Sequence, residues 1–284
     1  MIRTEILDMK TTTIAGRKVP VLGQGTWNIG DSASKREAEI AALLRGIECG
    51  MTLIDTAEMY GSGRSEDLVG ETIAGQRDLV YLVSKVLPSN ASAEGTVRAC
   101  EASLKRLRTD VLDLYLLHWR GRYPLHETIR GFERLLEKGK IRAWGVSNFD
   151  VDDMEELFNT PGGTVCAANQ VLYNPEHRGI EYDLLPWCEK NGVTVMAYSP
   201  VGQGRALLSS ASVRKVAQKH GISSAQVALA WCLRKQLLAI PKAGSVGHVE
   251  ENAAAASREL DAEDLAVIEE AYPAPVRRQS LNML

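Results

Sequence analysis

The 284-residue sequence lacks several features that mark particular protein classes. Its five cysteines are scattered and include no Cys-x-x-Cys pair. A disulfide framework or a structural zinc site is therefore not expected, and a reducing cytoplasm fits best. The net charge of -3 creates no field that would attract nucleic acid or an anionic membrane surface. We therefore expect no bound metal and no nucleic-acid partner.

Long apolar runs are also missing. No window approaches the roughly 18 apolar residues of a membrane span. The first ten residues, MIRTEILDMK, lack the apolar core of a signal peptide. The hydrophobic share of 45% is ordinary for a globular chain with a substantial core. Because no linker or low-complexity tract interrupts the chain, we expect one domain over residues 1–284, although its length would also allow two small domains.

Strand-like and helix-like segments alternate along the whole chain. The expected strands are residues 21–22, 52–55, 79–85, 112–118, 141–147, 167–171, 194–199 and 237–241. The expected helices start at Ser34, which forms a capping box with Glu37, and continue at residues 65–74, 92–107, 126–138, 151–158, 182–191, 224–233, 248–256 and 262–272. Continuous apolar strands suit a parallel sheet that is buried on both faces. The alternation predicts an α/β fold, a (β/α)8 TIM barrel, with a doubly wound open sheet as the structural rival.

Both ends of the chain carry additions to this barrel. Residues 11–23, TTTIAGRKVPVLG, are typical of a β-hairpin that turns at Ala15 and Gly16. We expect this N-terminal hairpin to close the barrel end at which the strands begin. Residues 273–284 form a short C-terminal tail.

Three successive strands each end on one ionisable residue. Asp55, Lys85 and His118 end strands two, three and four, and Tyr60 lies in the loop after strand two. Catalytic groups of (β/α)8 barrels sit at the C-terminal ends of the strands. Because these strands are neighbours, we expect the four side chains to converge at one site.

The four side chains suit chemistry on a carbonyl group. An ammonium beside a phenol favours the phenolate, so Lys85 should lower the pKa of Tyr60 from roughly 10 and make it a usable proton donor. A carboxylate at Asp55 balances the charge of Lys85, and His118 can hydrogen-bond a carbonyl oxygen. Hydride transfer to an aldehyde or ketone fits this set, and a nicotinamide cofactor must supply the hydride.

Simpler interpretations of these residues remain open. Asp55 and Lys85 alone would be typical of a structural ion pair, and a lone His118 of a satisfied core residue. The Gly23-Gln24-Gly25 segment is common in turns and does not open a helix, as a dinucleotide-binding fingerprint would. Lys85 could also form a Schiff base in a lyase or aldolase.

In their order and spacing, these four residues resemble the tetrad of the aldo-keto reductase superfamily, and further motifs extend the resemblance over about residues 12–272. They are GQGTW at 23–27, WGVSNF at 144–149, NQVLYN at 169–174, AYSPVGQG at 197–204 and IPKAGSVGHVEEN at 240–252. Among its members, the chain looks most like compact bacterial enzymes that reduce methylglyoxal and other small aldehydes. The resemblance implies a cofactor, NADP(H), and a small-molecule carbonyl substrate.

The resemblance also implies residue roles. Tyr60 is the general acid and base, Asp55 and Lys85 tune it, and His118 orients the carbonyl. The implied cofactor contacts are Gly25, Thr26, Trp27, Asp55, Ser147, Asn148, Gln170, Tyr198 (stacked on the nicotinamide), Ser199, Val201, Gln203, Lys242, Ala243, His248, Glu251 and Asn252. Trp27, Trp119 and His118 border the substrate. Arg120 and Arg122, in the loop after strand four, are candidates for holding a substrate carboxylate, with solvated loop charges as the commoner alternative. The short tail is expected to leave the pocket open.

Two departures weaken the implied preference for NADP(H). Members that prefer NADP read Lys-Ser, with Arg six residues after the Lys, where this chain has Lys242, Ala243 and His248. An unperturbed His has a pKa of roughly 6.5 and carries little charge at neutral pH, whereas Arg stays charged. We still expect NADP(H), supported by Lys242 and Ser245, with NAD(H) tolerated. A slow cofactor-binding accessory protein is the alternative function. The intact set of four residues and the lack of an added N-terminal segment argue against it, and we expect a monomer.

Overall fold

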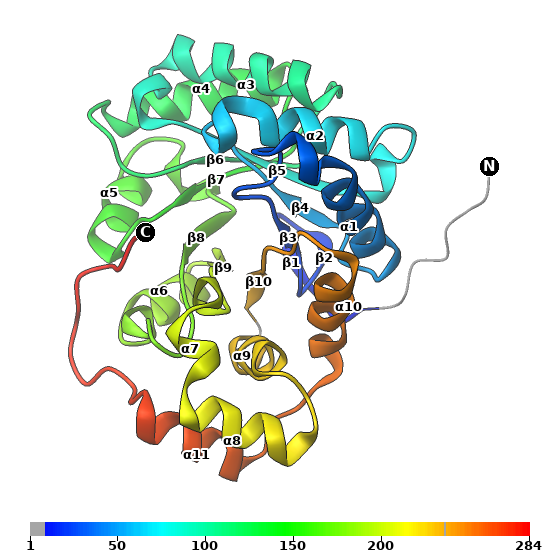
Figure 1. Ribbon diagram of the computed structural model, residues 1–284. Coiled ribbons are helices and arrows are strands. Elements are labelled where there is room, and N and C mark those ends of the chain that lie inside the picture. The colour runs from blue at the N-terminus through cyan, green and yellow to red at the C-terminus, as the bar shows by residue number, and fades with distance from the viewer. Residues whose placement is uncertain (1–8, 236) are drawn as a thin grey trace.

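The computed structural model describes residues 9–235 and 237–284, so most of the segment in which no signal peptide was expected lies outside the described residues. One parallel sheet of eight strands forms the centre of the described part, in the order β10-β9-β8-β7-β6-β5-β4-β3 (Figure 1). The strands are β3 (Gln24–Gly25), β4 (Leu53–Asp55), β5 (Tyr81–Val86), β6 (Leu114–Leu117), β7 (Trp144–Ser147), β8 (Ala168–Leu172), β9 (Thr194–Tyr198) and β10 (Leu238–Ile240).

The two edges of this sheet meet, which makes it a barrel. The amide of Gly23 donates to the carbonyl of Ala239 at 2.9 Å, and that of Gly25 donates to the carbonyl of Pro241 at 2.9 Å. Parallel bridges join Leu22 to Ala239 and Gly25 to Lys242. The predicted (β/α)8 barrel is confirmed, and the open doubly wound sheet is excluded.

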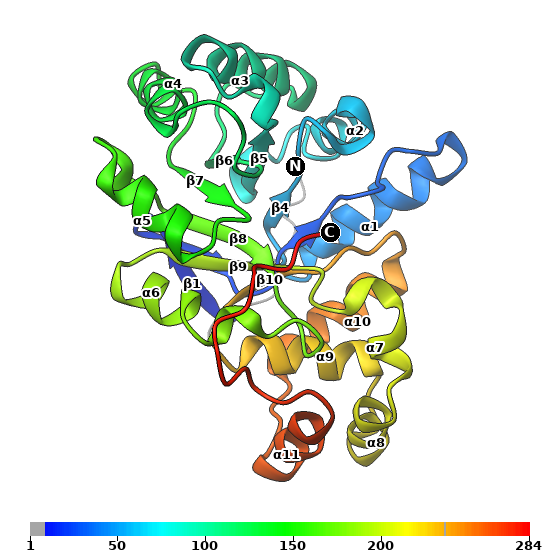
Figure 2. The same ribbon diagram turned by 90° about the vertical axis from the view of Figure 1, so that its left-hand side faces the viewer.

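Helices surround the barrel (Figure 2). They are α1 (Arg36–Glu48), α2 (Arg64–Thr72), α3 (Ala93–Leu107), α4 (Leu125–Glu137), α5 (Val151–Asn159), α6 (Leu184–Lys190), α7 (Ala206–Ser209), α8 (Ala211–His220), α9 (Ser224–Leu233), α10 (Val246–Ala254) and α11 (Ala262–Ala271). Helices α7 and α8 were missed by the sequence analysis. In α8, the buried residues Val213, Val216 and Ala217 have the spacing of a helix face, a signal that many polar neighbours obscured. No helix in the described ranges is both long and apolar enough to cross a membrane.

One expected helix start is wrong. A 3-10 turn, Ala33–Lys35, precedes α1, and the N-cap of α1 is Lys35, without a side-chain hydrogen bond. The Ser34 hydroxyl instead pairs with the Ser32 hydroxyl at 2.9 Å, so the predicted capping box with Glu37 does not form.

Alternate residues of each strand point to opposite sides and create two cores. Inside the barrel, Leu53, Val83, Leu114 and other alternate strand residues form one apolar cluster. Residues one position away, such as Leu82 and Tyr115, pack outward against the helices. This two-residue period decides which strand-end side chains enter the barrel.

The hairpin consists of β1 (Thr11–Ile14) and β2 (Arg17–Pro20), paired antiparallel around Ala15 and Gly16. Both turn residues have positive φ, 48° and 75°, as a tight two-residue hairpin turn requires. Ile14 and Val19 are buried in the apolar cluster inside the barrel. Because Thr194, the first residue of β9, donates to the carbonyl of Thr13 at 2.7 Å, the hairpin covers the end at which strands begin, as expected.

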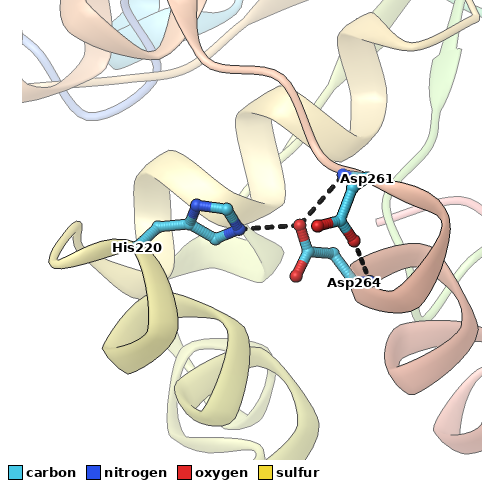
Figure 3. A group of neighbouring side chains, drawn as sticks. All are labelled: His220, Asp261 and Asp264. Atoms are coloured by element: carbon cyan, nitrogen blue, oxygen red, sulfur yellow. Dashed lines mark hydrogen bonds and ion pairs between the residues drawn. The ribbon is translucent and has the colours of Figure 1, made fainter.

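A charged cluster joins α8 to α11, beside the barrel. His220, Asp261 and Asp264 lie together (Figure 3), and the ammonium of Lys219 lies 2.9 Å from Asp261 and 2.8 Å from Asp264. The Asp264 carboxylate also accepts from His220 at 2.7 Å and from the Asp261 amide at 2.9 Å. The lysine thus supplies the positive charge that these carboxylates need, and the cluster serves as a helix junction.

Candidate active site

The barrel brings side chains from the ends of five of its strands to a common centre. In β4, β5 and β6 the inward-facing residues continue in steps of two to Asp55, Lys85 and His118, beyond Leu53, Val83 and Leu116. The same step leads to Gln170 after Ala168 in β8 and to Tyr198 after Met196 in β9. Strand periodicity therefore points these polar groups into the barrel mouth.

The ammonium of Lys85 is the hub of the predicted four-residue set. It lies 2.7 Å from Asp55 Oδ2, 2.9 Å from the carbonyl oxygen of Thr56 and 3.2 Å from the Tyr60 hydroxyl. The Tyr60 and His118 rings meet edge to face, with centroids 5.7 Å apart. The four side chains thus converge as the sequence predicted.

Burial changes the expected proton chemistry of Tyr60. Burial raises the pKa of the phenol above its ordinary value and outweighs the lowering effect of Lys85. The negative charge of Asp55 raises the pKa of Tyr60 further. The expectation of a lowered pKa is therefore wrong for this structure, because the protein removes the water that would stabilise a phenolate. Burial would also lower the pKa of Lys85, but Asp55 and Tyr60 outweigh it and raise that pKa. Tyr60 is thus held neutral and Lys85 charged.

His118 is held as a neutral imidazole. Burial lowers its pKa to about 3, and the charge of Lys85 adds to the effect. Its Nδ1 is buried and has no hydrogen-bond partner among the described residues. A neutral ring beside the Tyr60 phenol offers a hydrogen bond without adding charge to the site.

A hydrogen-bonded layer of amides and hydroxyls lies beside the four residues. Gln170 donates to Asp55 Oδ1 at 2.8 Å, and the Ser147 hydroxyl donates to the Gln170 carbonyl at 2.8 Å. Asn148 donates to the His118 carbonyl at 3.1 Å and accepts from the Tyr198 phenol at 2.9 Å. Strands β7, β8 and β9 are thereby fixed relative to the four-residue set.

These residues open into one cavity of about 940 Å³. Its walls include the predicted site residues Gly25, Thr26, Trp27, Asp55, Tyr60, His118, Trp119, Ser147, Asn148, Gln170, Tyr198, Ser199, Val201, Gln203, Lys242, His248, Glu251 and Asn252. Lys85 lies fully buried beneath this wall. Ala243 does not line the cavity, so its predicted contact is not supported; it packs on the outer core instead. A pocket of this size accommodates an extended ligand such as a dinucleotide together with a small substrate.

Several wall residues were not predicted. Met59 is half exposed at the rim, Arg205 follows the 3-10 turn Gly202–Gly204, and Ser223 caps α9. Ser223 opens a Ser-x-x-Gln capping box, which marked a helix start but gave no sign of a ligand. Met283 and Leu284 of the tail also line the cavity, a contact that the sequence analysis did not predict.

Strained backbone gathers on the same wall. Asn148, Ser199 and Gln203 have positive φ angles of 59°, 49° and 57°. Residues other than glycine rarely adopt such angles, and in proteins these outliers cluster at functional sites. Their position on the cavity agrees with a binding role for these three residues.

Lys242 and His248, both predicted site residues, line the same cavity. Lys242 continues the inward step of β10, and His248 lies in the first turn of α10, where Ser245 is the N-cap. By contrast, Arg120 does not line the cavity and pairs with Glu156 at 2.9 Å. Arg122 lies over the ring of Tyr123. The predicted role of these two arginines in holding a substrate carboxylate is therefore not supported.

Fold and site together define a (β/α)8-barrel oxidoreductase. The model of the aldo/keto reductase family matches residues 21–273. The methylglyoxal reductase YeaE of Escherichia coli (strain K12) is 54% identical over 271 residues, which cover 94% of this chain and 95% of that protein. The glyoxal reductase of Bacillus subtilis (strain 168) is 36% identical, with 88% of each chain covered.

A solved structure extends this match to three dimensions. The aldo/keto reductase from Klebsiella pneumoniae in complex with NADP and acetate has a TM-score of 0.95 and 49% identity, covering 98% of this chain and 100% of that one. The chain belongs to the aldo/keto reductase family.

Proposed function

We propose that this protein reduces small aldehydes and ketones, methylglyoxal among them, to alcohols with NADPH. One observation carries the proposal: the Lys85 ammonium joins Asp55, at 2.7 Å, to the Tyr60 hydroxyl, at 3.2 Å, beside the neutral His118. The names of the Escherichia coli and Bacillus subtilis relatives add the substrate class.

The residues around the cavity fit a nicotinamide dinucleotide, which supplies a hydride when bound. Ser147, Asn148 and Gln170 would hold the carboxamide, and the Tyr198 ring would lie against the nicotinamide. Ser199, Val201 and Gln203 lie in the loop that would follow the pyrophosphate. Gly25, Thr26, Trp27 and Asp55 border the opposite wall, and Glu251 and Asn252 would approach the adenine. The neighbouring Klebsiella pneumoniae structure contains NADP.

The chain's own residues supply the remaining chemistry. His118 hydrogen-bonds the carbonyl oxygen and orients it between Trp27 and Trp119. Tyr60 donates its phenolic proton to that oxygen as negative charge develops there. The ammonium of Lys85, 3.2 Å away, stabilises the resulting phenolate, and Asp55 keeps Lys85 charged and in place. The raised pKa of Tyr60 keeps the donor protonated before reaction.

The Lys85 environment disfavours a Schiff base. Its side chain is fully buried and does not line the cavity. Its raised pKa keeps it an ammonium, which is not a nucleophile. Borohydride trapping with a carbonyl substrate should therefore leave Lys85 unmodified.

We propose NADP(H) as the preferred cofactor and NAD(H) as a tolerated one. The side chain of Lys242 turns back over Gly244, where a Cβ atom would lie 3.3 Å from its ammonium, and His248 and Ser245 lie nearby at the start of α10. These groups would face a 2′-phosphate. Titration against tryptophan fluorescence should give tighter binding of NADPH than of NADH, and equal affinities would contradict the preference.

We further propose a cytoplasmic monomer whose partner is the carbonyl substrate alone, without nucleic acid. The five thiols are buried and unpaired, which agrees with a reducing compartment. Sedimentation of the purified protein tests its oligomeric state.

Tyr60→Phe tests the assigned proton donor. The variant should lose at least about a hundredfold in kcat for NADPH-dependent methylglyoxal reduction, since general-acid catalysis contributes about 10²–10⁴-fold. NADPH affinity should be nearly unchanged, because the ring remains. Near-normal turnover would reject Tyr60 as the donor. No turnover by the wild-type protein would favour a cofactor-binding accessory role.

A further inference from the structure

The C-terminal tail reaches the cavity. After α11, residues 273–284 run toward the middle of the barrel, shown in red in Figure 2. Met283 and Leu284 line the same cavity as Tyr60 and His118. The backbone of Leu284 lies beside the Tyr198 phenol, whose oxygen also contacts Asn148. The end of the tail is therefore in contact with the binding site.

One residue of the tail is held by three carboxylates. The Arg278 guanidinium lies 2.8 Å from Asp152 Oδ2, 3.2 Å from Asp183 Oδ2 and 3.7 Å from Asp150 Oδ2. Asp150 is the N-cap of α5 and Asp183 is the N-cap of α6. Arg278 thus ties the tail to the starts of two helices of the barrel.

The two aspartates at the helix starts divide their oxygens between two tasks. Asp150 accepts from the Asp153 amide, and Asp183 from the Leu184 amide, each through Oδ1. Each turns Oδ2 toward Arg278. The helix starts therefore fix both carboxylates before Arg278 binds. Forming the ion pairs then costs little side-chain entropy on the aspartate side.

Arg278 and its three aspartate partners form a clamp on the tail, and Arg278 lies close in sequence to Met283 and Leu284 of the cavity wall. Leu281, partly buried, packs on the outer core between them. Five residues of extended chain span at most about 18 Å. Fixing Arg278 and Leu281 therefore restricts where Met283 can lie.

The cavity that receives the tail has large apolar side chains among its walls. Trp27 and Met59 are about half exposed at the cavity, and Trp119 is also part of its wall. Met283 and Leu284 are apolar walls of the same cavity, and the proposed function assigns Lys242 and His248 to its cofactor end. A substituent on the carbonyl compound would contact these apolar groups and lose water on binding.

We propose that Arg278 is a positioning residue: it clamps the tail so that Met283 and Leu284 complete an apolar wall that selects carbonyl compounds with apolar substituents. The inference rests on the proposed function. Loss of the clamp should weaken the binding of long-chain aldehydes. It should have little effect on methylglyoxal, which is too small to reach Met283 and Leu284.

The experiment compares Arg278→Ala with Arg277→Ala. Arg277 is an exposed neighbour that forms no ion pair within residues 9–235 and 237–284, so it is a matched control. Hexanal and methylglyoxal serve as substrates with saturating NADPH. Arg278→Ala should raise KM for hexanal about tenfold, with kcat and the KM for methylglyoxal nearly unchanged. Arg277→Ala should change neither substrate.

Two further measurements separate the clamp from a general structural effect. The clamp is partly exposed, with 46% of the Arg278 side chain accessible, so 0.5 M salt should raise the hexanal KM of the wild type more than that of Arg278→Ala. Deleting Met283 and Leu284 should raise the hexanal KM similarly, and combining the deletion with Arg278→Ala should add little.

Hydrogen exchange tests the clamp without activity. Amides of residues 279–284 should exchange faster in Arg278→Ala than in the wild type and in Arg277→Ala. Equal KM increases for both aldehydes, or unchanged tail exchange, would overturn the proposal. If the wild type reduces neither aldehyde, the proposed function fails, and the exchange result still decides whether Arg278 holds the tail.

Discussion

At the scale of single residues, the site depends on how burial divides charge. Asp55 and Lys85 are both nearly inaccessible to water and are 2.7 Å apart. A buried ion pair gains little net stability, but losing one partner leaves an uncompensated charge. Tyr60 and His118 stay neutral beside this pair. The protein thus confines charge to one pair and leaves two neutral groups to contact the substrate.

His118 should make stability depend on pH. Its pKa is about 3 in the folded protein and about 6.5 when unfolded, so the unfolded state binds more protons between these values. Stability should therefore fall as the pH is lowered through this window. By pH 4.5 the loss from this residue amounts to about 3 kcal/mol.

His118→Asn should remove that part of the acid loss, as measured by urea unfolding at pH 7 and pH 4.5. His126→Asn is the control, because 58% of the His126 side chain is accessible. Equal acid losses in wild type and His118→Asn would show that His118 accepts a proton without cost in the folded state.

At the scale of elements, acidic residues at a helix start can also connect that helix to a neighbouring helix. Asp261 and Asp264 form a capping box at the start of α11, and Asp264 also contacts His220 from α8 (Figure 3). The ammonium of Lys219, also from α8, donates to Asp264 at 2.8 Å. Burial alone would raise the pKa of Asp264, but the hydrogen bond from Lys219 leads the contacts that lower it. The buried Asp264 carboxylate therefore takes part in the N-terminal cap of α11 and also binds Lys219 and His220 of α8.

Asp264→Asn should destabilise this junction by about 1–2 kcal/mol, because the amide keeps the capping geometry but loses the charge that Lys219 and His220 contact. Amides of α11 should also exchange faster. Glu263→Gln is the control, since Glu263 contacts the same lysine but is 77% accessible, and its change should be near zero. Equal effects of the two substitutions would assign the stability to general surface charge.

At the scale of the whole molecule, the two ends of the barrel have separate tasks. The hairpin fills the end at which the strands begin, and the polar side chains gather where the strands end. This division follows from the two-residue period of the strands and from the parallel direction of all eight strands. We therefore expect that stability and chemistry can be changed independently.

Ile14→Ala should test this separation. Ile14 is fully buried inside the barrel, and its truncation should cost about 2–4 kcal/mol of unfolding free energy. The kcat for methylglyoxal should stay near that of the wild type at a temperature where the variant is folded. Thr11→Ala, at an exposed hairpin position, should change neither quantity. A large loss of kcat in folded Ile14→Ala would show that the two ends are coupled.

Much of the barrel could be predicted because its signals are local. Apolar runs identified the strands, and Asp55, Lys85 and His118 were found because each ends such a run. Helix α8 was missed because its apolar face is narrow, and the Ser34 capping box was wrong because a 3-10 turn replaced the first helical turn. Arg205 and Ser223 reach the cavity only through the path of the chain after β9, and no local pattern shows that this path leads back to the site.

The sequence by itself determined the order of strands and helices, and which strand-end residues share the inward side, because a strand alternates its side chains whatever surrounds it. Only the tertiary structure decided the proton chemistry of Tyr60 and the place of the tail. Desolvation depends on every group that excludes water from the phenol, and the tail's position depends on carboxylates from two distant helices. Neither property is carried by neighbouring residues in the chain.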